Sequence, residues 1–128
     1  ECDEYLIKAV NTEGYDERLS ERDIKWKDES CACVILASGG YPKSYEKGKE
    51  ISGLDDKGQA DGVFVYHAGT KLSDGVFTTN GGRVLGVTAT GKDLETALAN
   101  AYSGAKKITF DKVHYRNDIG KRALAALK

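Results

Sequence analysis

The spacing of hydrophobic residues changes several times along the chain, and each spacing predicts a different element. Residues 31–38 form an almost unbroken apolar run, with the length and β-branched content of a strand that is buried on both faces. Gly39 and Gly40 end this run. Residues 41–58 combine glycine and charge with little apolar periodicity, so they predict a loop with a short helical piece.

The first thirty residues predict only fragments of structure. Apolar positions within residues 3–10 share one helical face for barely two turns, and the alternation over residues 24–26 predicts a short strand. An isolated helix of that length is marginal in water. The chain also contains no methionine and begins with Glu1. We therefore expect a piece of a longer protein whose first segment belongs to structure lying upstream.

Three further strands follow the loop at short intervals. Residues 63–67, 76–79 and 83–90 have strand patterns, and tight turns are predicted at residues 73–75 and at residues 80–82. Connections of this length join antiparallel neighbours. The sequence therefore predicts an antiparallel meander.

The period then lengthens to that of a helix. Apolar residues recur from Leu94 to Ala105 on one stripe, and Asp93 is placed to cap the helix N-terminus. Residues 108–110 predict another strand, and residues 118–127 a closing helix that Asp118 could cap. Several strands with segregated helices indicate an α+β domain, in which an antiparallel meander sheet packs against a few helices.

Composition and charge exclude several classes of protein. The 128 residues carry 19 Lys and Arg against 20 Asp and Glu, a formal net charge of -1. Such a balance provides no field that would gather nucleic acid or anionic lipid. No run of about 18 apolar residues is present, so the sequence predicts no transmembrane helix. We expect neither a nucleic acid nor a membrane as partner.

The three cysteines argue against a metal centre. Cys31 and Cys33 lie two apart in the predicted strand, which places both on one face, whereas metal and redox sites use a C-x-x-C turn. The chain has only His67 and His114 as imidazole ligands. We expect reduced thiols buried in the core, no metal site and a cytoplasmic protein.

One near-match to a phosphate-binding loop fails on chemistry. Residues 86–92 fit G-x-x-x-x-G-K between a predicted strand and a predicted helix, but the next residue is Asp93 where a P-loop has Ser or Thr. A carboxylate there would repel a bound phosphate. The sequence favours a strand, a turn and a capped helix.

The best candidate for binding chemistry lies at two strand ends that contain glycine. His67 and Lys71 flank one segment, and residues 79–83 form the other, ending in Arg83. If the sheet brings these segments together, two cations and the glycine N–H groups would suit a phosphate monoester. Two solvated cations beside hairpin turns remain the alternative. No nucleophile paired with a base is recognisable, so no catalytic residue is predicted.

Several blocks, taken together and in order, resemble one family. Residues 33–42, 45–48, 67–71, 79–88, 114–116 and 118–120 are similar to the C-terminal domain of the phosphoribosylamine–glycine ligases, at the spacing of that family over about 90 residues. Residues 1–30 resemble the last helix and a short strand of the preceding ATP-grasp portion. The resemblance implies a domain over residues 31–128 that follows an ATP-grasp tail over residues 1–30.

The resemblance also implies a reaction. The family joins glycine to 5-phosphoribosylamine and hydrolyses ATP to ADP and phosphate, in purine synthesis, through an acyl phosphate of glycine. ATP and the acidic ligands of Mg²⁺ are held in the upstream ATP-grasp portion, whose motifs this sequence lacks. We therefore expect this chain to supply part of the phosphoribosylamine site, together with the upstream domains of the same chain, and to be inactive alone.

Site residues are implied by the same resemblance. Arg83 is the first candidate for the sugar phosphate and Lys71 the second. We add the hypothesis that Gly81 and Gly82 permit close approach and that Asn80 contacts the sugar. Further candidates are Arg116, His67 and the loop at residues 39–41, for which packing of this domain on the upstream domains is the alternative role. The competing interpretation is a small non-catalytic module that binds a phosphorylated metabolite.

Overall fold

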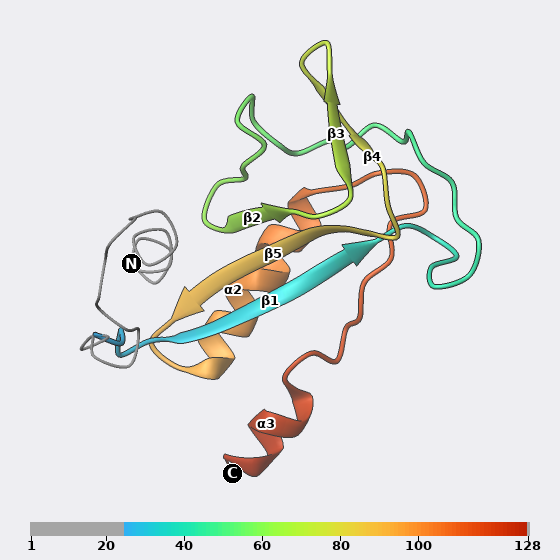
Figure 1. The fold of residues 1–128 in the computed structure, drawn as a ribbon. Helices are drawn as coiled ribbons and strands as arrows, with labels where there is room; N and C mark the ends of the chain where they lie inside the picture. Colours follow the sequence, from blue (N-terminus) through green and yellow to red (C-terminus); the bar gives the residue numbers. More distant parts are fainter. Residues whose placement is uncertain (1–24, 128) are drawn as a thin grey trace, which may run out of the picture.

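The computed structural model describes residues 25–127, which form two antiparallel sheets and two helices (Figure 1). The larger sheet has the strand order β1-β5-β2, and the smaller one pairs β3 with β4. The elements are β1 (Ser30–Ala37), β2 (Phe64–His67), β3 (Thr70–Ser73), β4 (Val76–Thr79), β5 (Arg83–Gly91), α2 (Leu94–Lys107) and α3 (Lys121–Ala126). The predicted α+β class is confirmed.

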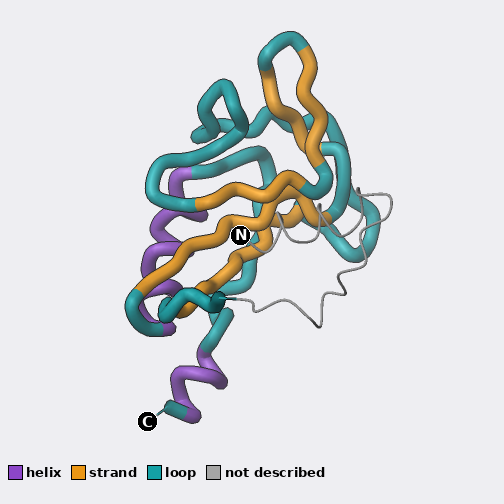
Figure 2. Tube along the Cα trace, turned by 60° about the vertical axis from the view of Figure 1, so that its left-hand side comes forward, coloured by secondary structure: helices purple, strands orange, loops and turns teal. Residues whose placement is uncertain are grey.

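The hydrophobic core lies between the larger sheet and α2. Figure 2 shows α2 as a layer on one side of the strands, with the β3–β4 hairpin projecting beyond the sheet. On the helix side, Val34 pairs with Val87 and Leu36 with Leu85, and all four are fully buried. The buried stripe of α2 is mostly alanine, which lets the helix approach the sheet closely.

The predicted helix and its cap are confirmed. The Thr96 N–H donates to the Asp93 carboxylate at 2.8 Å, which satisfies one of the free N–H groups at the start of α2. Strand β5 runs without interruption to Gly91, so the near-match to a P-loop is a strand that leads into a capped helix. The same β5 occupies the centre of the sheet.

The strand order differs from the predicted meander. Strand β4 pairs with β3, a strand that the sequence pattern did not reveal, and these two form a separate hairpin closed by Asp74 and Gly75. After this hairpin the chain returns, and β5 inserts between β1 and β2. Local turn signals identified the hairpin but did not indicate which strands β5 would pair with.

Strand β1 is buried on one face only, so the prediction of two buried faces is wrong. Cys31, Cys33 and Ile35 alternate with buried residues and are exposed. Both cysteines do lie on one face, as predicted, but they are exposed thiols rather than core thiols. The reason is that α2 covers one side of the sheet and no described residue covers the other (Figure 1).

Three further predictions also need correction. Residues 41–58 contain no helix, and isolated β-bridges join Glu50 to Thr78 and Ser52 to Thr109. That last bridge is all that exists of the strand predicted at residues 108–110. Lys25 and Trp26 lie outside any strand, while Ile24 and the helix predicted over residues 3–10 fall outside the described residues.

The closing helix is shorter than predicted. Helix α3 begins after Gly120, whose φ of 76° only glycine adopts readily, and it has no side-chain cap. Asp118 pairs with Arg116 instead of capping the helix. Ile119 and Leu124 are half-buried, whereas Leu127 is exposed. Within the described range, no helix is long and apolar enough to cross a membrane.

The cap of α2 makes stability depend on pH. Hydrogen bonds from the Thr96 side chain and then its backbone N–H hold the pKa of the Asp93 carboxyl below its ordinary value of 3.8. The carboxylate therefore stabilises the fold fully above pH 3.8, and this contribution is lost as the pH falls through the lowered pKa. We expect Asp93→Ala to lower the urea midpoint at neutral pH, with the difference from wild type shrinking below pH 3.8.

The control is Asp56→Ala, which removes a carboxylate from an exposed turn. It should leave the midpoint close to wild type at every pH. A difference between wild type and Asp93→Ala that stayed constant into strong acid would contradict the role of the ionised carboxylate.

Candidate functional site

The two glycine-containing segments predicted to form a site do meet in the structure. The Asn80 N–H donates to the Gly69 carbonyl at 2.7 Å, and the Gly69 N–H donates to the Val84 carbonyl at 3.1 Å. A Cβ added at Gly69 would lie 2.6 Å from the Arg83 carbonyl oxygen and 2.7 Å from Cα of Gly81. Only glycine at position 69 permits this approach, which fixes Arg83 beside the end of β2.

Arg83 borders a depression at this end of the larger sheet. The depression has a volume of about 420 Å³ and is mainly apolar apart from the arginine and the backbone of the two segments. Its lining comes from β1, from the turn after β1, from the β2–β3 connection and from the start of β5: Ile35, Tyr41, Ala68, Gly69, Gly82, Arg83 and Leu85.

The turn after β1 holds the glycine pair in place. The Ser38 hydroxyl donates to the Gly81 carbonyl and the Ser38 N–H donates to the Gly82 carbonyl, each at 2.8 Å. The Tyr41 ring lies on Gly82 so closely that a Cβ there would overlap it. Within residues 25–127, the N–H groups of Gly81 and Gly82 have no hydrogen-bond acceptor. Two N–H donors beside a guanidinium suit an anion.

His114 lies beside Ala37, on the side opposite to Arg83, and the sequence did not reveal this pairing. Ala37 pairs with Arg83 on one side and exchanges two backbone hydrogen bonds with His114 on the other, at 2.7 and 2.9 Å. Side chains of residues paired across strands lie on the same face. The imidazole and the guanidinium therefore flank Ala37. The bridge is a long-range pairing between a strand end and a loop, so no local signal in the sequence marks it.

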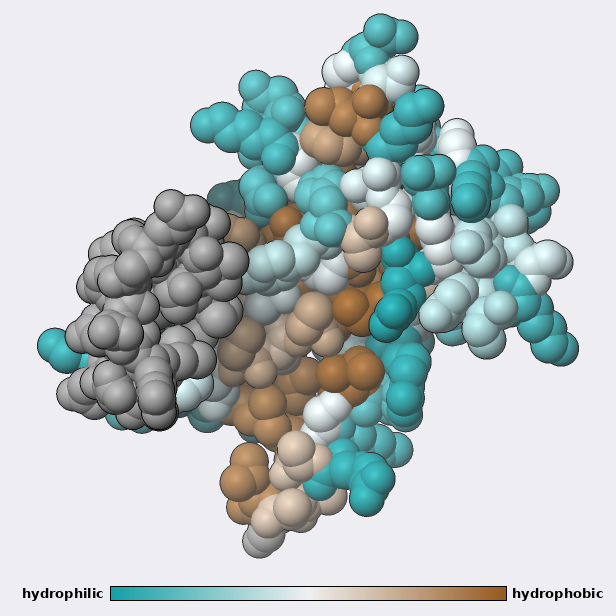
Figure 3. Space-filling model, viewed as in Figure 1, coloured by the Kyte–Doolittle hydropathy of each residue, from teal (hydrophilic) through white to brown (hydrophobic). Residues whose placement is uncertain are grey.

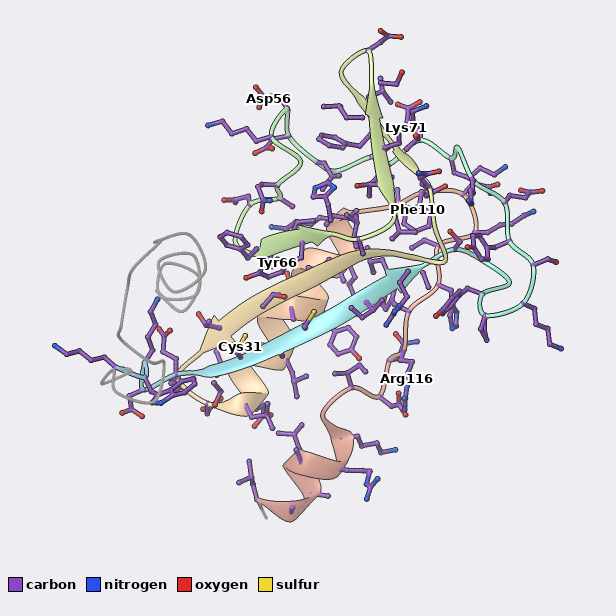
Figure 4. The ribbon with its side chains drawn as sticks, viewed as in Figure 1. Cys31, Asp56, Tyr66, Lys71, Phe110 and Arg116 are labelled. Carbon is purple, nitrogen blue, oxygen red and sulfur yellow. The ribbon has the colours of Figure 1, made fainter. Side chains whose placement is uncertain are left out.

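Lys71 and Asn80 are close in sequence to residues that line this depression, but they do not line it themselves. Lys71 is exposed on the projecting β3–β4 hairpin, where it pairs with Thr78 (Figure 4). Asn80 is exposed, and its backbone rather than its side chain ties the two segments together. Of the predicted cations, Arg83 is the one that borders the depression among the described residues.

Both nitrogens of the His67 ring contact other groups of the protein. Its Nδ1 lies 2.8 Å from Oγ1 of Thr70, and its Nε2 lies 2.8 Å from the Gly58 carbonyl oxygen. The ring also packs on Phe77, with 5.0 Å between the ring centroids. Both ring nitrogens are occupied by the protein itself. His67 therefore connects the 55–60 turn to the hairpin.

Arg116 is engaged by Asp118 through two hydrogen bonds of 2.9 Å. The hydrogen bond from this guanidinium, followed by its charge, holds the pKa of the Asp118 carboxyl below its usual range. The Tyr102 hydroxyl donates to the Arg116 carbonyl at 2.6 Å, which ties this segment to α2. These contacts give Arg116 a role in holding residues 116–119 on the helix.

The described residues do not form a metal centre or a recognisable catalytic cluster. No group of three or more His, Cys, Asp or Glu side chains between residues 25 and 127 could hold a metal ion. The ion pair between Lys49 and Glu46, at 2.9 Å, joins a half-buried lysine to an exposed carboxylate. What the arrangement around Arg83 can do is bind an anion at the end of a sheet.

Known proteins are similar to this chain in sequence and in fold. Residues 31–122 match the family described as Phosphoribosylglycinamide synthetase, C domain. A phosphoribosylamine–glycine ligase of Synechocystis is 55% identical over 101 residues, which cover 79% of this chain and 24% of that protein. The ligase of Clostridium acetobutylicum is 49% identical over 122 residues, covering 91% of this chain and 28% of that protein.

A solved structure agrees with these relatives. The crystal structure of phosphoribosylamine–glycine ligase from Thermotoga maritima superposes with a TM-score of 0.61 and 41% identity, covering 69% of this chain and 21% of that one. This chain thus spans about a quarter of the length of the curated relatives that it matches. Since the family match covers most of its residues, the chain belongs to the phosphoribosylglycinamide synthetase family and contains the C domain of that family.

Proposed function

We propose that this chain is the C-terminal part of a phosphoribosylamine–glycine ligase, an enzyme that joins glycine to 5-phosphoribosylamine with hydrolysis of ATP to ADP and phosphate. The observation that carries the proposal is that Arg83 and Gly82 line a mainly apolar depression, next to Gly81 in the chain, and that no hydrogen bond within residues 25–127 uses the N–H groups of the two glycines. This chain would supply the part of the site that receives the sugar phosphate.

Each residue has a distinct part in this proposal. Arg83 binds the phosphate through two parallel hydrogen bonds, and the N–H groups of Gly81 and Gly82 add donors at close range. Lys71 acts as a second, more distant positive charge, and Asn80 contacts the sugar. Anchoring the phosphate positions the amine for attack on the activated glycine. Arg116 and His67 remain weaker candidates, because their polar groups already bind other residues.

The described residues do not fit ATP or Mg²⁺. Strand β5 leads directly into a helix capped by a carboxylate, and residues 25–127 offer no group of acidic ligands. We propose that both are bound by upstream domains of the same polypeptide. Residues 1–30 would be the tail of that ATP-grasp portion, and residues 31–128 the C-terminal domain. The start of β1 at Ser30 supports this boundary.

The proposal includes the cellular setting. The substrates are small molecules of central metabolism, and the exposed thiols of Cys31 and Cys33 suit a reducing compartment. We therefore propose a cytoplasmic enzyme with neither nucleic acid nor membrane among its partners.

The test compares two proteins, this 128-residue chain and the product of the reading frame extended upstream. We expect the extended product to form ADP only when glycine and phosphoribosylamine are both present. The chain alone should form none, because the groups that bind ATP are absent from it. Activity of the chain alone, or an extended product without ligation, would contradict the proposal.

A further inference from the structure

The sheet face opposite α2, here called the open face, carries apolar side chains that no described residue covers. Figure 3 shows hydrophobic residues along β1 on this side, beside paler residues of the neighbouring strands. Strand β1 contributes Cys31, Cys33 and Ile35, and β2 contributes Phe64 and Tyr66. Phe64 is 60% exposed, Tyr66 53% and Ile35 43%.

These side chains form one continuous patch. Phe64 and Cys33 both pair with Thr88, while Tyr66 and Ile35 both pair with Gly86. A Cβ added at Gly86 would meet Sγ of Cys33 at 3.2 Å, Cδ1 of Ile35 at 3.6 Å and Cβ of Tyr66 at 3.7 Å. Figure 4 shows Cys31 and Tyr66 on the same side of the sheet. Glycine in the central strand thus lets side chains of both outer strands converge over it.

Each end of the open face has one basic residue beside it, Arg83 at one end and Lys27 at the other. One end is the depression beside Arg83. The other is a depression of about 480 Å³, which Cys31, Phe64 and Tyr66 line together with Lys27. Lys27 lies three residues before β1, so the chain that precedes β1 reaches the sheet on this face. Between the ends, the paired positions on this face are apolar, thiol, threonine or glycine.

We propose that the open face is the docking surface for the polypeptide that precedes residue 25 in the longer ligase, an inference that rests on the proposed function. Contiguous exposed apolar patches mark surfaces that another chain or domain covers. The relatives contain further polypeptide that could cover this face, since the matched region is only 24% of the Synechocystis ligase. The preceding chain enters at the Lys27 end, and a domain laid along the face would reach the Arg83 depression and enclose it.

The natural cysteines provide the test in the extended protein. Cys31 and Cys33 lie on the open face, and Ser73→Cys places a reference thiol on the exposed β3–β4 hairpin. A maleimide should modify Cys31 and Cys33 roughly tenfold or more slowly than the reference thiol, because reaction requires local opening of the covered face. All three thiols should react alike in urea. Mass spectrometry of peptides separates the sites.

Equal rates for Cys31, Cys33 and the reference thiol in the native protein would overturn the proposal. Protection that disappears on dilution would also overturn it, because it would assign the face to a second copy of the chain. Ligation is assayed on the same sample. If the thiols react rapidly in a protein that catalyses ligation, the docking surface is contradicted and the proposed function is not. If the thiols are protected in a protein without ligation activity, docking is supported and the proposed function is contradicted.

A pair of lysine substitutions gives a second measurement. Tyr66 and Leu72 are similarly exposed, at 53% and 56%, but only Tyr66 lies on the open face. Tyr66→Lys should lower the melting temperature of the extended protein by several degrees, since it places a charge in a covered apolar contact. Leu72→Lys should leave it within about one degree. Equal effects of both substitutions would contradict the docking surface.

Discussion

Replacing Arg83 by alanine in the extended ligase is expected to lower kcat/KM for phosphoribosylamine by roughly 30-fold to 1,000-fold. Loss of one charged, bidentate contact costs about 2–4 kcal/mol, and each 1.4 kcal/mol is about a factor of ten. The loss should appear mainly in KM, because the phosphate is bound but not changed in the reaction. Steady-state kinetics with phosphoribosylamine varied, at saturating glycine and ATP, measure it.

Three variants sharpen this measurement. Arg83→Lys should recover part of the loss, because an ammonium keeps the charge but not the two parallel hydrogen bonds. Arg122→Ala removes an exposed arginine from α3 and should leave KM unchanged. Lys71→Ala should have a smaller effect than Arg83→Ala, because Lys71 lies outside the lining of the depression. An unchanged KM in Arg83→Ala would contradict the proposal that Arg83 binds the sugar phosphate.

The largest loss of stability is expected from Leu36→Ala. Leu36 is fully buried between the larger sheet and α2, opposite the equally buried Leu85. Truncating a leucine in such a place removes its burial and leaves a cavity, which together cost about 2–5 kcal/mol. The free energy of unfolding in urea should fall by this amount, and the melting temperature by roughly 10 °C.

Leu72→Ala is the matched control, because it removes the same atoms from an exposed leucine on the β3–β4 hairpin. Its free energy of unfolding should stay within about 0.5 kcal/mol of wild type. If both substitutions lowered stability equally, the core would not lie where β1 and β5 face α2.

The site shows where sequence reasoning stops. Glycines beside Lys71 and Arg83 indicated two segments suited to an anion, and the contact of Gly69 with Gly81 is consistent with their meeting. The sequence pattern could not show that Arg83 borders the depression whereas Lys71 lies outside it on the hairpin. That difference arises because β3 and β4 form a sheet separate from the one that contains β5. Nor could it place His114 beside Ala37, which depends on a bridge between segments 77 residues apart.

The sequence by itself determined the elements whose signals are local. The helix that starts after Asp93, the turn at Asp74 and Gly75 and the breaks at glycine pairs follow from caps, backbone freedom and period, which act over a few residues. The ordered blocks of residues from 33 to 120 also determined the family.

Only the tertiary structure decided what covers each face. The same apolar run at residues 31–38 could be buried on both sides or on one, because a run of apolar residues does not say how many layers pack on it. The single helix layer of α2 left Cys31, Cys33 and Ile35 exposed, and β5 took the central place between β1 and β2. Pairing and layering are settled by contacts between residues far apart in the chain, which local patterns do not encode.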